Sequence, residues 1–254
     1  MTEVSAAGLL ALWERVATEP PGRRASVLLS WAAPDADPAG VTVGEENDKL
    51  LRLYQRAFGG ALSGVVDCPA CGEPLEVTVG VAQLIGGLAG AGVIGGLAGG
   101  LAGGLAGADR GQVYESNLDG HLLRYRVPSA LDLTRPPDSG RWLLEACLTE
   151  AVGPDGSPLG AGDLPDSVVA SLEQAMADLD PGAELRLDLS CPACEREWSE
   201  FLDPVEFLSI EVEARAREAV EAVQALATAY GWSEAEILAL SPWRMRLYLT
   251  TAGQ

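Results

Sequence analysis

Apolar residues recur every three or four positions near the start of the chain, which is the spacing of amphipathic helices. They predict a first helix around Leu9–Val16, a second short helix or buried segment over Arg23–Trp31, and a third helix over Val43–Phe58, which Gly59 and Gly60 end. We expect the first helix to pack its apolar face on the core. That face consists of Leu9, Leu10, Leu12, Trp13 and Val16.

The C-terminal segment has an equally regular helical pattern. Asp203 can cap a long helix whose first residue is Pro204, and Gly231 supplies a left-handed stop. A capping box at Ser233–Glu236 starts a short helix, and a last helix covers Trp243–Thr251. One long helix followed by two short ones has the outline of a helix-turn-helix. A helical hairpin that packs on its own long helix or on a partner fits the acidic charge of the chain better.

Between these ends, the pattern predicts a smaller unit of strands and helices. Two strands, Gln112–Glu115 and His121–Val127, form a hairpin across Asn117–Gly120. Two helices follow, over Trp142–Val152 and Val168–Leu179. This region therefore carries both kinds of element within a short stretch.

Two Cys-Pro-Ala-Cys tetrapeptides hold four of the five cysteines. Each is expected to form a turn between two short extended segments, and two intervening residues let both thiolates reach one tetrahedral ion. Two such turns that face each other complete a zinc ribbon, so the sequence predicts one structural Zn²⁺ per chain. The predicted ligands are Cys68, Cys71, Cys191 and Cys194. The flanking segments are Gly64–Asp67, Leu75–Val79, Glu184–Leu189 and Glu197–Phe201.

Two other interpretations of the cysteines remain open. A redox-active Cys-x-x-Cys pair normally precedes a helix that activates one thiol, whereas extended segments and several glutamates follow these pairs. Disulfides need an oxidising compartment, which nothing in the sequence indicates. The fifth cysteine, Cys147, lies in an apolar helical pattern and is expected to be a buried small hydrophobic residue.

The long separation of the two cysteine pairs predicts the architecture. If they share a metal, the region between them must leave and return at one place. The expected fold class is α+β, a mainly helical chain whose two-knuckle zinc-ribbon clasp joins the N- and C-terminal parts around an inserted lobe. The expected units are residues 1–80 (N-terminal helices and first knuckle), 81–109 (insertion), 110–182 (inserted lobe) and 183–254 (second knuckle and C-terminal helices).

Residues 77–108 carry no charge and repeat the sequence Gly-Gly-Leu-Ala. A stretch of this length invites a transmembrane interpretation. Its many glycines, its flanks without a Lys/Arg bias and the need to keep both cysteine pairs on one side argue against a span. We therefore expect a low-complexity insertion over 81–109. An apolar interaction segment and a true span are the alternatives.

The formal charge of −20, with Lys49 as the only lysine and His121 as the only histidine, restricts the function. Such a chain repels phosphate backbones and anionic lipids, so we expect neither nucleic acid nor membrane as a partner. His121 is expected to be a strand residue beside a turn. No P-loop, Gly-x-Ser-x-Gly or dinucleotide-binding motif occurs, which predicts a protein that is not an enzyme. The acidic N-terminal helix does not resemble a targeting signal, so a cytoplasmic location is expected.

Several of these features together resemble a known family. They are the leucine-rich first helix with a tryptophan, a Cys-Pro-x-Cys-Gly knuckle, a second Cys-Pro-x-Cys before Trp198, and the closing segment Ala229–Tyr248. This combination is similar to the baseplate hub assembly chaperone family of T-even phages and related contractile injection systems. The resemblance covers roughly 1–80 and 110–254, and Ala229–Tyr248 is its most specific part. The glycine-rich stretch departs from the family pattern, as does Glu195, where such turns often have glycine.

The resemblance implies a non-enzymatic helper that builds the baseplate of a contractile tail, with baseplate or hub proteins as partners. It transfers no catalytic residue. A zinc-ribbon regulator that binds nucleic acid and a dithiol oxidoreductase remain as alternatives. Aromatic residues cluster in the closing segment, and aromatics often anchor interfaces, although they can equally join the short helices to the long one. The expected partner-binding residues are Trp243, Arg244, Arg246 and Tyr248.

Overall fold

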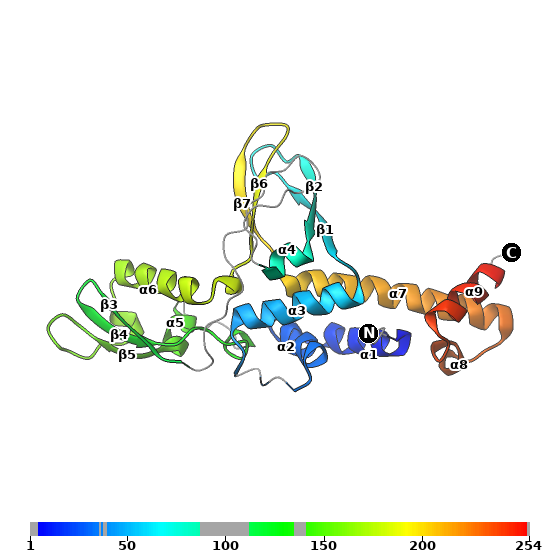
Figure 1. The fold of residues 1–254 in the computed structure, drawn as a ribbon, viewed down its shortest axis with the longest axis horizontal. Helices are drawn as coiled ribbons and strands as arrows, with labels where there is room; N and C mark the ends of the chain where they lie inside the picture. The colour runs from blue at the N-terminus through cyan, green and yellow to red at the C-terminus, as the bar shows by residue number, and fades with distance from the viewer. Residues whose placement is uncertain (1–4, 36, 38–39, 87–111, 135–140, 253–254) are drawn as a thin grey trace.

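A computed structural model describes residues 5–35, 37, 40–86, 112–134 and 141–252. It confirms the α+β class and the mainly helical composition. The 27-residue helix α7 (Pro204–Tyr230) lies along the long axis and runs from the middle of the molecule to one end (Figure 1). Two β-hairpins rise from its N-terminal half, a lobe lies at one end, and a small helical unit lies at the other.

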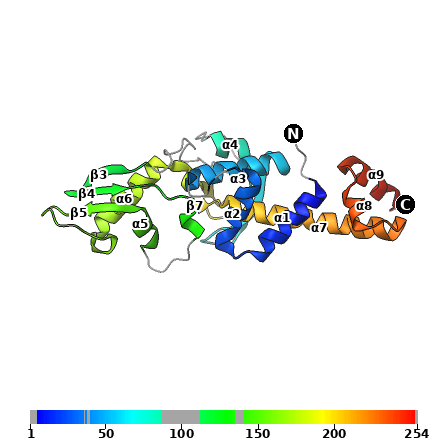
Figure 2. The same ribbon diagram turned by 90° about the horizontal axis from the view of Figure 1, so that it is seen from below.

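The base consists of α7 and three N-terminal helices, α1 (Ala6–Thr18), α2 (Pro21–Ala32) and α3 (Val43–Ala57). All four were expected from the sequence. A capping box at Thr42 begins α3, and Gly59 with φ of 123° follows its end. Seen from below, these helices lie along the middle of the molecule (Figure 2). Their apolar faces form one core in which residues from both ends of the chain are buried together.

Both ends of α7 have the capping residues that the sequence predicts. The Asp203 side chain accepts a hydrogen bond from the Val205 amide, Pro204 is the first helical residue, and Gly231 has a left-handed φ of 69°. The buried stripe of α7 includes Leu208, Val212, Ala216, Ala219, Ala222 and Leu226. At 1.5 Å per residue the helix is about 40 Å long, so its C-terminal end reaches beyond the base.

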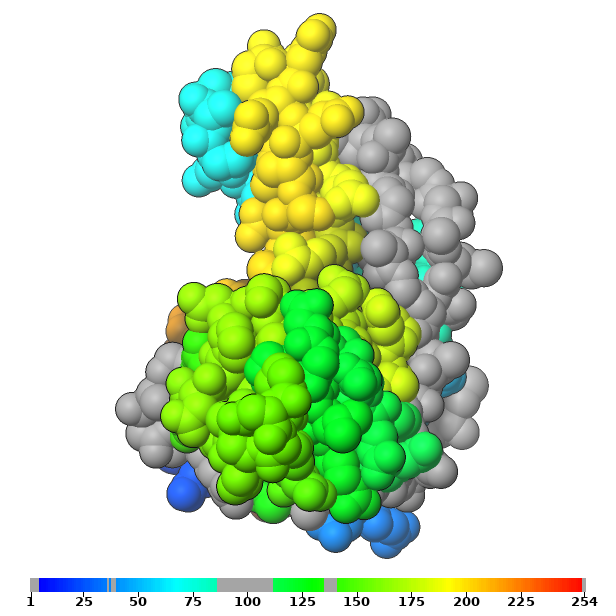
Figure 3. Space-filling view, turned by 90° about the vertical axis from the view of Figure 1, so that its left-hand side faces the viewer, coloured from blue at the N-terminus to red at the C-terminus, as the bar shows by residue number. Residues whose placement is uncertain are grey.

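Two antiparallel hairpins stand on the base. The first pairs β1 (Ala61–Asp67) with β2 (Pro74–Gly80), and the second pairs β6 (Arg186–Ser190) with β7 (Glu197–Phe201). A two-stranded hairpin is marginally stable alone. Here residues such as Leu62, Val79 and Leu189 are buried in the base, which anchors both hairpins. Figure 3 shows the hairpins side by side above the lobe.

The expected insertion begins later than the sequence predicts. Residues Val81–Gly86 form the short helix α4, which packs on α3, and Val81 and Leu84 are buried in the core of the base. The sequence pattern did not reveal this helix, because six residues are too few to show a helical period. The rest of the expected insertion, 87–109, lies outside the described residues. Among the helices that are described, none has the length and apolar character needed to cross a membrane.

The lobe has its own core. Its sheet has the order β3 (Tyr114–Leu118), β4 (His121–Tyr125) and β5 (Leu148–Val152), all antiparallel. It also contains α5 (Trp142–Cys147) and α6 (Asp166–Leu179). Short 3₁₀ turns occur at Asp132–Thr134 (η2), Ala161–Asp163 (η3) and Pro181–Ala183 (η4).

The predicted helix over Trp142–Val152 is wrong in its second half. The helix ends at Cys147, and Leu148–Val152 form β5 instead, with Leu123 opposite Ala151 and Tyr125 opposite Leu148. Pairing with β4 buries Ala151, and this gain outweighs the helical pattern of the segment. His121 begins β4 beside the turn, as expected.

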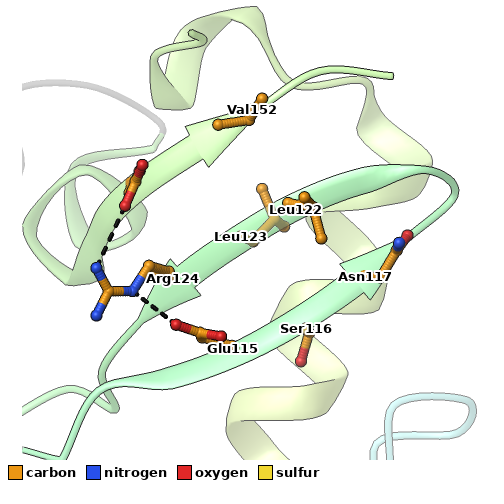
Figure 4. A pocket seen from close by; sticks show the side chains of 8 residues that line it. Glu115, Ser116, Asn117, Leu122, Leu123, Arg124 and Val152 are labelled. Atoms are coloured by element: carbon orange, nitrogen blue, oxygen red, sulfur yellow. Dashed lines mark hydrogen bonds and ion pairs between the residues drawn. The ribbon is translucent and has the colours of Figure 1, made fainter. Parts of the chain in front are cut away.

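One face of the lobe sheet carries exposed side chains, several of which are drawn in Figure 4. On it, Arg124 forms ion pairs with Glu115 at 3.0 Å and Glu150 at 3.3 Å, one on each neighbouring strand. Leu122 and Val152 lie opposite each other nearby. The three charged groups are well exposed, so they contribute little to stability.

The lobe is joined to the base at the N-terminus of α3. The Gly44 amide donates to the buried carboxylate of Asp180 at 2.9 Å, and the Asn47 side chain donates to the carbonyl of Gly182 at 2.8 Å. A single β-bridge pairs Thr42 with Ser129. Residues from both sides of the lobe thus close on one helix end, as expected for an inserted unit.

Candidate metal centre

The tip of each hairpin is closed by the same pair of backbone hydrogen bonds. In the first, the Cys68 amide donates to the Glu73 carbonyl and the Gly72 amide to the Cys68 carbonyl, both at 2.9 Å. In the second, the Cys191 amide donates to the Arg196 carbonyl and the Glu195 amide to the Cys191 carbonyl, also at 2.9 Å. The sequence does not single out Glu73 and Arg196, because their contribution is made by backbone carbonyls.

The residue after each tetrapeptide has a left-handed backbone. Its φ is 73° at Gly72 and 59° at Glu195. This turn directs the chain back into β2 and β7 and leaves both cysteines of each tip on the side that faces the other hairpin. Glutamate therefore adopts the conformation that glycine adopts in the first tip.

The two tips bring all four predicted cysteines together. The Sγ atoms of Cys68 and Cys194 are 3.7 Å apart, and those of Cys71 and Cys191 are 3.6 Å apart. All four sulfur atoms lie within 4.8 Å of one another. A tetrahedral ion with bonds of about 2.3 Å to sulfur requires sulfur–sulfur distances of about 3.8 Å. The cluster therefore fits a metal ion without rearrangement of the strands.

Each hairpin contributes one inner and one outer ligand. Cys68 and Cys191 are buried, while Cys71 and Cys194 are exposed. The cross-hairpin sulfur distances exceed the disulfide bond length of about 2.05 Å, and strands rather than helices follow both tetrapeptides. All four cysteines are free, and the arrangement favours metal ligation over the two alternative interpretations.

The thiols alter one another's affinity for protons. Burial raises the pKa of Cys68, but hydrogen bonds from the backbone of Ala70 and Cys71 outweigh it and hold that pKa at about 7. The backbone of Glu73 lowers the pKa of Cys71, yet contacts with the other thiols raise it to about 12. One thiol of the cluster thus ionises readily, and a bound cation would displace the remaining protons.

Cys147 has no part in this centre. It is fully buried in α5, and burial raises the pKa of its thiol to about 11. The expectation of a buried small hydrophobic residue is confirmed.

The expected partner-binding residues lie together on α9 (Pro242–Ala252), which follows α8 (Glu234–Leu238) at the far end of α7. Trp243 is 65% exposed. Tyr248 instead joins an aromatic cluster, with its ring 4.9 Å from Trp232 and 5.8 Å from Tyr230. This cluster attaches α9 to the end of α7, so Tyr248 holds the unit together and Trp243 stands on its surface.

No family model, curated protein or solved structure matches the chain in comparisons with known proteins.

Proposed function

We propose that the protein is a non-enzymatic assembly chaperone or scaffold for the baseplate hub of a phage-like contractile tail, stabilised by a structural zinc ion. The proposal joins the resemblance of the closing segment to two physical features. These are a closed four-thiolate centre and an exposed helical unit at the end of α7.

The chemistry of the cluster supports zinc as a structural ion. Four thiolates in a tetrahedral arrangement suit Zn²⁺, and they occupy every coordination position. Such a site has no open position for a substrate or an activated water. A centre of this kind joins two hairpins and offers no catalysis, as a scaffold protein requires.

The observation that carries the proposal is the composition of α9. No residue between Pro242 and Ala252 is buried in the described structure, and Trp243 and Leu247 are exposed beside Arg244 and Arg246. Beyond Glu236 the sequence contains two arginines and no acidic residue, although the whole chain has a charge of −20. Tryptophan and arginine are typical anchors of protein interfaces. This face fits an acidic partner surface with an apolar recess.

The test is a double substitution, Trp243→Ala with Arg246→Glu, in cells that depend on this protein for contractile particles. We expect normal folding and metal content but a large loss of assembled particles. The matched control is Ile210→Ala with Arg217→Glu, which removes one exposed apolar residue and reverses one arginine elsewhere on the surface. Normal particle yields from the first variant would contradict the proposal.

A gel-shift titration with DNA and RNA at low salt tests the nucleic-acid alternative. The proposed function predicts no shift, because the acidic field opposes phosphate contacts. A shift that high salt abolishes would favour the zinc-ribbon regulator instead.

A further inference from the structure

A groove of about 330 Å³ lies where the base, the second hairpin and the lobe meet. Its walls come from α2, α3, η2, the end of β7 and the start of α7, and they include Ala25, Leu133, Leu185 and Leu202. Its volume is in the range of small-ligand sites, about 300–1,000 Å³. The walls are largely apolar, so the polar groups in the groove are conspicuous.

Glu46 lines this groove from the first turns of α3. Glu46 is only 3% exposed, and its Oε1 atom has no hydrogen-bond partner among the described residues. A buried carboxylate without a partner is costly. Burial, and then the nearby carboxylate of Asp203, raise the pKa of Glu46 to about 7. The fold therefore retains an acid at a place that disfavours its charge.

The other charged groups at the groove do not neutralise Glu46. Asp203, the cap of α7, accepts a hydrogen bond from the Val205 amide at 2.8 Å. Glu184 lies at the rim and forms an ion pair with Arg186 at 3.1 Å, while Arg186 covers the ring of Phe201. Within the described part of the chain, the lining contains three acidic residues and no Lys, Arg or His.

We propose that this groove binds an ammonium or guanidinium group at the end of an aliphatic stem, with the charged head paired to Glu46 and the stem against the apolar walls. Lysine and arginine side chains have this construction. The same chemistry occurs in small free amines, and the experiment separates the two sources. The inference does not depend on the proposed function, since it rests on a different part of the molecule.

The test uses NMR titration of the full-length, metal-loaded protein with N-acetyl-arginine amide, agmatine and the neutral N-acetyl-norleucine amide. We expect the cationic probes to shift the resonances of the groove residues and to bind at least about tenfold more tightly than the norleucine probe, about 1.4 kcal/mol. Tighter binding of the capped arginine would assign the site to a side chain of a partner protein. Tighter binding of agmatine would assign it to a free amine.

Glu46→Gln should remove this preference, while Glu45→Gln should retain it. The control makes the same charge change one residue away and keeps a side chain that can complete the capping box with Thr42. Affinity for the cations should also fall below pH 7, where Glu46 becomes protonated. Equal binding of the charged and neutral probes, unchanged binding by Glu46→Gln, or no binding at tens of millimolar would overturn the proposal.

Discussion

At the scale of single residues, Gly72 and Glu195 occupy equivalent positions in the two knuckles, although only Glu195 has a side chain. Both have positive φ at the point where a knuckle turns back into its second strand. Glycine adopts this conformation freely, whereas a residue with a Cβ atom pays about 1–2 kcal/mol. The backbone of the second knuckle is therefore strained at Glu195, whereas the backbone of the first is unstrained at Gly72.

We predict that Glu195→Gly stabilises the metal-loaded protein by about 1 kcal/mol, because it removes this strain. The reciprocal change, Gly72→Ala, should destabilise it by a similar amount. Denaturant unfolding of both variants under identical metal conditions measures the two effects. A loss of stability on Glu195→Gly would show that the glutamate side chain compensates for its backbone.

A second prediction concerns Glu46 and pH. Its pKa is about 7 in the folded protein against an ordinary value of 4.5, so the folded state binds more protons between these values. Stability from this group therefore falls as pH rises from about 4.5 to 7. Glu46→Gln lacks the effect and should match the natural protein near pH 5 but exceed it near pH 8, by up to about 3 kcal/mol.

Thermal unfolding at the two pH values provides the measurement, with Glu45→Gln as the control that shows no such difference. Equal stability of Glu46→Gln and the natural protein at pH 8 would mean that the buried carboxylate has found a partner.

Sequence reasoning succeeded for residues whose role is local. Cysteine spacing, helix caps and Gly231 each depend on neighbours a few positions away, and all are in their predicted places. Glu46 and Asp180 were not recognised. An acid in the first turn of a helix, such as Glu46, is ordinary, and so is an acid that follows a helix end, such as Asp180. Only packing against segments distant in the sequence buries these two.

At the scale of elements, the same distinction separates the correct predictions from the errors. Periodicity predicted α1, α3, α6 and α7 because each buries one continuous stripe. It failed for β5, whose identity is decided by its pairing with β4 far away in sequence. It also missed α4, which is too short to show a period.

The two hairpins should depend on the metal as a pair. We predict one zinc ion per chain by elemental analysis of protein purified without chelator, and loss of that ion in Cys71→Ser. Structural zinc sites contribute on the order of 10 kcal/mol of apparent binding free energy, so the melting temperature should fall strongly. Cys147→Ala is the matched control, because it also removes a thiol but should keep the metal. Less than half an equivalent of zinc in the natural protein would refute the assignment.

At the scale of the whole molecule, the base and the lobe each have a core of their own, and hydrogen bonds join them at the N-terminus of α3. Gly44 allows this close approach, because a Cβ atom there would come within 3.0 Å of the Gly182 backbone and closer still to the Asp180 carboxylate. The absence of a side chain at this position therefore permits the lobe to dock.

Gly44→Ala should loosen the joint and cost about 1–3 kcal/mol, the usual range for overpacking. Differential hydrogen exchange should show greater exchange at Gly182 and Ala183 while the core of the lobe stays protected. Gly162→Ala, where an added Cβ meets nothing within 4 Å, is the control. Unchanged exchange at the joint in Gly44→Ala would indicate that the lobe docks elsewhere.

The separation of the two cysteine pairs also determines when the metal centre can form during synthesis of the chain. Cys71 and Cys191 are 120 positions apart, and a ribosome adds about 5–20 residues per second. The first knuckle therefore leaves the ribosome roughly 6–24 seconds before its partner. Throughout this interval a nascent chain offers two thiols to any metal or oxidant in the cell. The centre can close only after the lobe and the second cysteine pair have been made, so ligation reports that the chain has been synthesised through Cys194.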